Sequence, residues 1–172
     1  MNYITPILET DRLILKKGTL NDYLKVYEYD FSYLKGIDGI YEYKTTNPKD
    51  IEEFMDVPNC IDFIVYLKDT NEAIANICLD RYDSINKSLE IIVNEHPNYW
   101  KSGYMSEALN KIIDYVFNTL DIDCLIYSYI SDNLNSKVLS EKLGFKYSDK
   151  YNMHLKKLNK DVEMIKTILK RH

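Results

Sequence analysis

The sequence is short of the residues from which several common active sites are built. Its five glycines are scattered singly, and it contains neither of the glycine-rich phosphate-binding motifs, GxxxxGK[ST] and GxGxxG. The GxSxG nucleophile motif is also missing. The three histidines, His96, His154 and His172, do not stand at zinc-ligand spacing, so we expect no metal site built on histidine. His154 and His172 are expected to be surface or packing residues.

Cysteine and long apolar runs are scarce as well. Cys60, Cys78 and Cys124 each stand alone in an apolar run, and an odd number cannot pair completely within one chain. We predict that they are buried, reduced thiols of a cytoplasmic protein. No stretch approaches the roughly 18 apolar residues that a membrane span requires. The first ten residues lack a signal-peptide pattern, so we expect a soluble protein without a membrane partner.

Charge and size narrow the class further. The chain has 172 residues, 45% of them hydrophobic and 28% charged, which is ordinary for a globular protein. We expect a single domain over residues 1–172, because no repeat, low-complexity tract or flexible linker divides it. The formal net charge of -5 argues against a nucleic-acid partner, because a protein that binds nucleic acid usually has a basic face.

Helix and strand patterns alternate along the chain. Apolar residues recur at helical spacing from Met105 to Leu120, and Thr19 with Asp22 resembles a capping box at the start of an earlier helix. Short apolar runs between turn residues predict strands, the middle three forming an antiparallel meander. The predicted strands are 12–16, 62–67, 73–82, 89–94 and 124–130; the predicted helices are 20–29, one that begins at Pro48 after the cap Asn47, 105–120, and one from Asn133 to Leu143 that stops at Gly144.

The tail from Lys146 onward fits two patterns. Val162, Ile165, Ile168 and Leu169 have helical spacing, but the same segment also fits two strands around a turn at Leu158–Lys160. Periodicity alone does not decide between a helix and a hairpin here.

One segment combines a strand end with a helix start. Residues 98–109, NYWKSGYMSEAL, follow the strand 89–94 and open the helix 105–120, and the strand 124–130 comes next. Two strands that flank a helix can lie parallel and adjacent. The unpaired amides of a helix N-terminus suit a pyrophosphate, with Ser102 as the predicted N-cap and Gly103 allowing close approach to the backbone.

Several motifs together resemble the GCN5-related N-acetyltransferases (GNAT) of the ribosomal-protein alanine acetyltransferase (RimJ/RimL) type. Members of that subfamily begin with ETERLILR, where this chain has ETDRLILK, and continue with EIGYWL, PEYWGKGYMTEAL and DNxxSxxVLEKLGF. The corresponding stretches here are EIIVNEHPNYWKSGYMSEAL and DNLNSKVLSEKLGF, at the same spacing and without gaps. The resemblance runs from Glu9 to the end and favours the hairpin in the tail.

The resemblance implies an α/β (α+β) GNAT fold. A mixed, mostly antiparallel sheet would splay between two central parallel strands, with helices on both faces and acetyl-CoA as cosubstrate in the split. The pyrophosphate would lie on the turn at the start of the helix, and the pantetheine arm would pair with the strand edge. The implied cofactor-binding residues are Asn94, Glu95, Lys101, Ser102, Gly103, Tyr104, Met105 and Asn133.

The implied reaction is direct attack of a neutral amine on the thioester, without a covalent enzyme intermediate or a metal. Ser136 occupies the subfamily's serine position near the sulfur, and Leu139 stands where other acetyltransferases have an acidic tyrosine. Glu90 fits the family's strand glutamate that serves as base. Glu95 is a second carboxylate near the expected cleft, and His96 is a third candidate with a suitable intrinsic pKa.

The resemblance further implies an amine acceptor, either a small molecule or a peptide, and a monomer or homodimer. The aromatic-rich segment 27–43 is expected to form part of the acceptor wall. Two positions depart from the family pattern: Lys101 replaces a glycine, and Glu95 adds a negative charge near the cofactor. These departures support an alternative, a degenerate GNAT fold that binds a partner or regulates without turnover.

Overall fold

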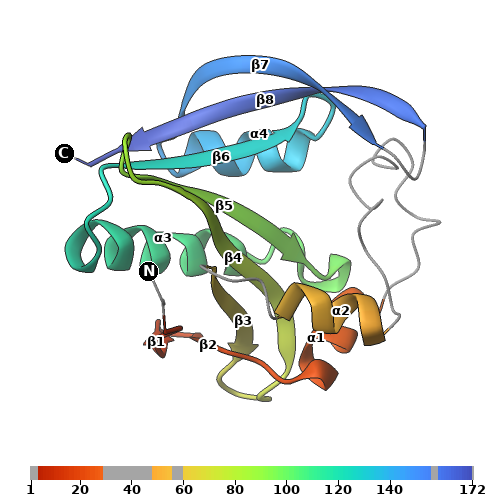
Figure 1. Cartoon of the computed structure of the whole chain (residues 1–172). Coiled ribbons are helices and arrows are strands. Elements are labelled where there is room, and N and C mark those ends of the chain that lie inside the picture. The colour runs from red at the N-terminus through yellow and green to blue at the C-terminus, as the bar shows by residue number, and fades with distance from the viewer. Residues whose placement is uncertain (1–3, 29–47, 56–59, 156–158, 172) are drawn as a thin grey trace.

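One mixed sheet of eight strands organises the molecule (Figure 1), and the computed structural model describes residues 4–28, 48–55, 60–155 and 159–171. The strand order is β1-β2-β3-β4-β5-β6-β8-β7, and every neighbouring pair is antiparallel except β5 and β6. The strands are β1 (Leu8–Glu9), β2 (Leu13–Lys16), β3 (Ile61–Leu67), β4 (Ala73–Asp83), β5 (Ser88–Glu95), β6 (Cys124–Ile130), β7 (Lys146–Leu155) and β8 (Lys160–Lys170).

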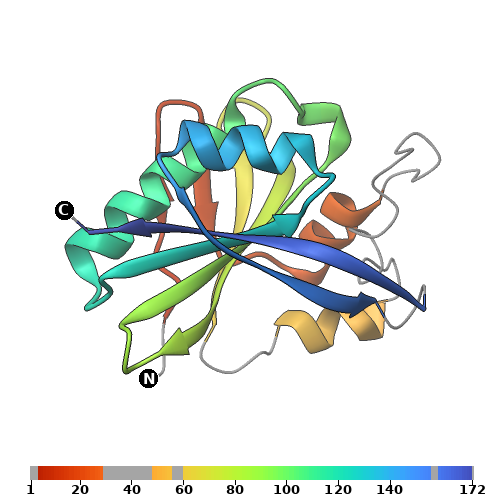
Figure 2. The ribbon, with the colours of Figure 1, turned by 90° about the horizontal axis from the view of Figure 1, so that it is seen from above.

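Helices cover the sheet from both sides. They are α1 (Leu20–Tyr27), α2 (Pro48–Met55), a short 3₁₀ helix (Pro97–Tyr99), α3 (Tyr104–Thr119) and α4 (Leu134–Lys142). Figure 2 shows α3 on one side of the central strands and α1 with α2 on the other. The predicted GNAT-type architecture is therefore confirmed, and so is the parallel pair of strands around α3.

The alternation of side chains along β3 explains why this strand is buried on both faces. Phe63 and Val65 join the larger core, which the apolar stripe of α3 closes through Ala108 and Ile112. Ile64 and the other residues on the opposite face pack in a second core with Tyr23 and Val26 of α1. Since successive strand residues point to opposite faces, Asp62 lies on the α1 side with Ile64.

The two parallel strands stay paired over only half of their length. Ser88–Ile91 of β5 pairs with Cys124–Tyr127 of β6, and the pairing ends there. Beyond that point β5 continues to Glu95 against β4, while β6 continues to Ile130 against β8. In Figure 1 the two strands run together at the left and separate toward the right. The sheet therefore opens between residues 92–95 and residues 128–130.

Local sequence signals placed most elements correctly. The Asp22 carboxylate accepts a hydrogen bond from the amide of Thr19 at 2.8 Å, as the capping box predicted. Asn133 caps α4 by accepting from the amide of Ser136, and Gly144 follows that helix with a left-handed φ of 87°. The tail forms the hairpin β7–β8 rather than a helix. The first helix ends at Tyr27, and Asn47 and His172 lie outside the described residues.

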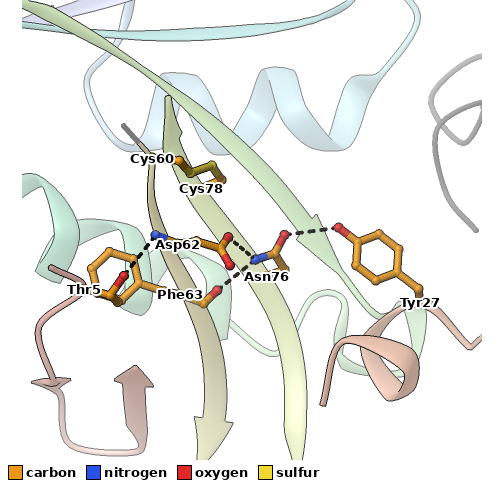
Figure 3. The surroundings of a disulfide bond; sticks show 7 residues. All are labelled: Thr5, Tyr27, Cys60, Asp62, Phe63, Asn76 and Cys78. Atoms are coloured by element: carbon orange, nitrogen blue, oxygen red, sulfur yellow. Dashed lines mark hydrogen bonds between the residues drawn. A yellow bond between two sulfur atoms is a disulfide. The ribbon is translucent and has the colours of Figure 1, made fainter. Parts of the chain in front are cut away.

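The prediction of three reduced thiols is wrong for two of them. Cys60 and Cys78 are joined in a disulfide (Figure 3), with their Cα atoms 6.6 Å apart. The cause is the strand register: Cys78 of β4 lies opposite Asp62 of β3, and Cys60 precedes Asp62 by two residues on the same face. Cys124 is the free cysteine of the described chain.

Membrane insertion by a helix finds no support in the fold. None of the helices in the described part of the chain is both long and apolar enough to cross a bilayer.

Candidate active site

A cavity of about 660 Å³ lies where β5 and β6 separate. Its wall combines residues of β3 to β8, α1, α3 and α4, and it includes Asn94, Glu95, Met105, Asn133 and Ser136. The volume is within the usual range for a pocket that holds a small-molecule ligand or cofactor. The opening of the sheet thus brings together several residues that the sequence had marked at separate places.

The turn ahead of α3 is shaped by two left-handed residues. Lys101 has a φ of 63° and Gly103, the N-cap of α3, a φ of 80°. The prediction that Ser102 caps the helix is wrong, because the chain turns through Gly103 instead, and the side chain of Ser102 makes no cap hydrogen bond. The lysine adopts the conformation that a glycine would favour, and its side chain is exposed. The replacement therefore leaves the backbone of the turn in place.

The start of α3 offers unpaired donors. Among the described residues, the amides of Gly103, Tyr104 and Met105 have no hydrogen-bond acceptor. Such amides, together with the partial positive charge of a helix N-terminus, suit an anionic group such as a pyrophosphate. Met105 is buried and lines the cavity, so the turn adjoins the opening between the strands.

Arg12 holds this turn, a role that the sequence alone does not indicate. Its Nε donates to Glu107 Oε2 at 2.7 Å, and its Nη1 donates to the carbonyl oxygen of Ser102 at 3.2 Å. The guanidinium also lies over the ring of Tyr104, 4.4 Å from its centroid. Arg12 therefore ties the first turn of α3 to β2. The ETDRLILK motif was the available signal, but only the fold shows what its arginine contacts.

Ser136 lies at the centre of a small polar network. Its Oγ accepts hydrogen bonds from the Oη of Tyr127 at 3.2 Å and from the Nδ2 of Asn133 at 2.8 Å. Burial raises the pKa of Tyr127 to about 12, so this hydroxyl stays protonated at neutral pH. Since both acceptor positions of Ser136 are used, its own proton is directed elsewhere; among the described residues it has no acceptor.

Glu90 lies on the cavity wall but already has a strong partner. Its Oε2 accepts from Arg81 Nη1 at 2.7 Å, and its side chain is 12% exposed. Arg81 is more exposed, and the neighbouring carboxylate raises its pKa. The carboxylate that the resemblance implies as the base is therefore already engaged in an ion pair.

Glu95 lies five residues farther along the same strand, where β5 has left β6. Its side chain lines the cavity, and burial raises its pKa to about 7. The indole Nε1 of Trp100 donates to its backbone carbonyl at 2.9 Å, which ties the end of β5 to the turn before α3. A carboxyl group that titrates near neutral pH has the properties of a general base.

His96 uses both of its ring nitrogens within the fold. Nδ1 accepts from the amide of Asn98 at 3.2 Å, so the proton is on Nε2, which lies 3.1 Å from the carbonyl oxygen of Glu28. The imidazole therefore connects the end of β5 to the end of α1 and uses both of its ring nitrogens in these contacts.

Three potential metal ligands meet beside the cavity. Ligand atoms of Cys60, Asp62 and Cys78 lie within 4.8 Å of one another. Their separation along the chain does not reveal this cluster, because Cys60 directly precedes β3, Asp62 lies in β3 and Cys78 lies in β4. With the two sulfurs joined to each other, Asp62 supplies the charged group of this cluster.

The comparisons with known proteins agree with this geometry. Residues 12–146 match the family model of the acetyltransferase (GNAT) domain. The uncharacterised N-acetyltransferase YoaA of Bacillus subtilis strain 168 is 28% identical over 150 residues, covering 81% of this chain and 82% of YoaA.

Two solved structures share the fold. The ribosomal-protein-S5-alanine acetyltransferase of Vibrio fischeri has a TM-score of 0.74 at 15% identity, covering 96% of this chain and 97% of that one. The microcin C7 self-immunity acetyltransferase MccE, in complex with acetyl-CoA and AMP, has a TM-score of 0.70 at 17% identity, covering 93% and 94%. Together with the family match, the open sheet and the turn before α3 lead to one conclusion: the chain belongs to the GNAT family and is an N-acetyltransferase.

Proposed function

We propose that this protein transfers an acetyl group from acetyl-CoA to a primary amine by direct attack, with Glu95 as the general base and Ser136 as the hydrogen-bond donor to the departing sulfur. The observation that carries the proposal is the place where β5 and β6 part, because the cavity there is lined by both Glu95 and Ser136.

Acetyl-CoA, the acetyl donor, fits the residues at this opening. The unpaired amides of Gly103, Tyr104 and Met105 would hold the pyrophosphate, with Lys101 and Ser102 beside it. Near Asn94 and Glu95, beyond the pairing of β5 with β6, the side of β5 opposite β4 would hold the pantetheine arm as a neighbouring strand, and Asn133 would contact it from the other side. When bound, acetyl-CoA supplies an acetyl group activated as a thioester.

Glu95 serves as the base in preference to Glu90. An amine attacks only in its neutral form, so an acceptor that arrives as an ammonium ion must lose a proton. Glu95 has no charged partner among the described residues and a pKa of about 7, whereas the carboxylate of Glu90 is already paired with Arg81. Glu90 stays a prediction of the sequence resemblance, and the ion pair argues for an indirect role.

Ser136 acts on the sulfur. Tyr127 and Asn133 both donate to its Oγ, which orients the hydroxyl hydrogen away from them. A hydroxyl polarised in this way is a good donor to a sulfur on which negative charge develops. Leu139, at the position where other family members have a tyrosine, lines the same cavity without offering a proton.

Calorimetry and an acceptor screen test the proposal together. We expect acetyl-CoA to bind with measurable heat, and a panel of primary amines to release free thiol in proportion to acetylated product. Substitution Ser136→Ala should lower kcat about 10- to 100-fold, because it removes one hydrogen bond to a developing charge, while the acetyl-CoA affinity stays the same. No binding at millimolar acetyl-CoA would overturn the proposal, and an unchanged kcat would remove Ser136 from it.

The remaining expectations concern context rather than chemistry. We propose a protein of the cytoplasm that acts as a monomer or homodimer on a small-molecule or peptide amine, without nucleic acid or membrane. The segment 29–47, most of the expected aromatic acceptor wall, lies outside the described residues, but Tyr23 and Tyr27 of α1 line the cavity.

A further inference from the structure

Asp62 is a buried carboxylate with one oxygen left over. It lies in β3, 8% exposed, on the face that borders the cavity. Its Oδ1 accepts from Asn76 Nδ2 at 2.8 Å, whereas its Oδ2 is buried and has no hydrogen-bond partner among the described residues. Leaving a buried charged oxygen without a partner is costly, so such a group is expected to have a ligand.

The amide of Asn76, which donates to Asp62 Oδ1, cannot also donate to that oxygen. The two hydrogens of Asn76 Nδ2 are both used, one on Asp62 and one on the carbonyl of Phe63 at 3.0 Å. The amide oxygen of Asn76 accepts from Tyr27 Oη at 3.1 Å. Figure 3 shows this chain of side chains, which runs from β3 across β4 to α1 beside the disulfide. Asp62 is thereby held in one orientation.

Tyr23 has a second buried polar atom without a partner among the described residues, and its side chain lines the same cavity. Its Oη has no hydrogen-bond partner in the described part of the chain, and the side chain is 2% exposed. Tyr23 and Tyr27 both come from α1, and both line the cavity. A carboxylate oxygen and a phenol oxygen left over on one wall are two acceptors for the hydrogens of an ammonium group.

The charge of the cavity agrees with a cationic ligand. Among the described residues that line it, Asp62, Asp80, Glu90 and Glu95 are acidic, and Arg81 is the basic one. Arg81 is already paired with Glu90. Burial raises the pKa of Asp62 to about 6, with opposing contributions from the Asn76 hydrogen bond and Lys17, so the group is mostly ionised at neutral pH. A wall of one sign concentrates ligands of the opposite sign.

We propose that Asp62, with the hydroxyl of Tyr23, is the subsite for a second positive charge on the acceptor, and that the acceptor is a diamine or polyamine. This inference rests on the proposed function: one amino group reacts beside Glu95 and Ser136, while the distal ammonium binds Asp62. Acceptors that carry a carboxylate next to the amine, such as free amino acids, would meet like charge along this wall.

The test compares two acceptors that differ only in the distal charge, 1,4-diaminobutane and butylamine. For the wild-type protein we expect kcat/KM for the diamine to exceed that for the monoamine by about 30-fold or more, as expected of a charge-assisted hydrogen bond in a buried site. Asp62→Asn keeps the shape of the side chain and should reduce this ratio to about threefold or less, through KM of the diamine. The monoamine kinetics and the acetyl-CoA affinity should stay unchanged.

Two further variants make the result specific. Asp80→Asn removes a charge from the same wall at a less buried position, and it should leave the ratio within about threefold of wild type. Tyr23→Phe removes only the hydroxyl and should raise KM for the diamine about 3- to 10-fold. If Asp62→Asn fails to fold, the wild-type ratio and Tyr23→Phe still decide the question.

The failures of the two proposals are distinguishable. Absence of acetyl-CoA binding, or of turnover with every amine, would overturn the proposed function. If acetyl-CoA binds and amines are acetylated, but diamine and monoamine react equally or Asp62→Asn keeps the preference, the cation subsite alone is overturned.

Discussion

The two ends of β5 carry the same kind of side chain in opposite circumstances. At the closed end, where β5 pairs with β6, Glu90 is neutralised by Arg81. At the open end, Glu95 pairs with β4 but no longer with β6, and it lies half-buried without a charged partner among the described residues; burial raises its pKa to about 7. The parting of two strands thus separates an ion-paired carboxylate from one suited to proton transfer.

The surroundings of a glutamate decide which role it can take. Both glutamates are close to the cleft in sequence, and an ordinary glutamate is a weak base at neutral pH. An opposite charge lowers the tendency of a carboxylate to bind a proton, while burial without such a partner raises it. Partner and burial therefore decide between Glu90 and Glu95.

The largest effect is expected when the open-end carboxylate is removed. Glu95→Gln should lower kcat about 100-fold, in the range usual for loss of a general base, with unchanged acetyl-CoA affinity. In the wild type, kcat/KM should rise as the pH increases through about 7, because the base works only when deprotonated. Assays of thiol release between pH 5.5 and 9 measure kcat of the variant and the pH dependence of kcat/KM.

The matched control is Glu90→Gln at the closed end of the same strand. It should cost less than about fivefold in kcat and keep the rise near pH 7. If Glu90→Gln loses the pH dependence and Glu95→Gln keeps it, the roles of the two ends are reversed.

Stability against pH gives an independent measure of the same contrast. The pKa of Glu95 is raised in the folded state, so between about 4.5 and about 7 the folded protein binds more protons than the unfolded chain. The free energy of unfolding should therefore fall as pH rises through this window, by an amount on the order of 3 kcal/mol from this residue. Asp62 contributes in the same direction between about 4 and 6, because its pKa is also raised.

Urea unfolding at several pH values separates these contributions. The difference between wild type and Glu95→Gln should change across the window from pH 4.5 to 7. A pH-independent difference for Glu95→Gln would mean that its carboxyl titrates normally.

A smaller effect is expected at the turn that adjoins the open end. Gly103→Ala forces a side chain into a left-handed conformation and should lower stability by about 1–2 kcal/mol and acetyl-CoA affinity about tenfold. Lys101 also has a left-handed backbone, which a glycine adopts without strain. Lys101→Gly should therefore raise stability by about 1 kcal/mol and change acetyl-CoA affinity less than fivefold. Thermal unfolding measures the stability of both variants, and calorimetry measures their affinity for acetyl-CoA. Together they test whether the backbone of the turn, rather than the charge of the lysine, holds acetyl-CoA.

Much of this architecture could be predicted from local patterns. The stripe from Met105 to Leu120 predicted α3, and the cap at Asn133 with Gly144 predicted the bounds of α4. The resemblance decided for the hairpin in the tail, where periodicity fitted two structures. Ser102 was the wrong cap, because a left-handed glycine can begin a helix without a capping side chain.

By itself, the sequence determined the order of strands and helices and the turn from which a pyrophosphate site can be made, since periodicity, caps and glycine act within a few residues. Only the tertiary structure decided which carboxylate is free, which cysteines meet and which buried oxygen lacks a partner. Arg81 is nine residues from Glu90 along the chain, and Asn76 is fourteen from Asp62. Such pairings depend on strand register and on where β5 leaves β6, and both are set by contacts between distant segments.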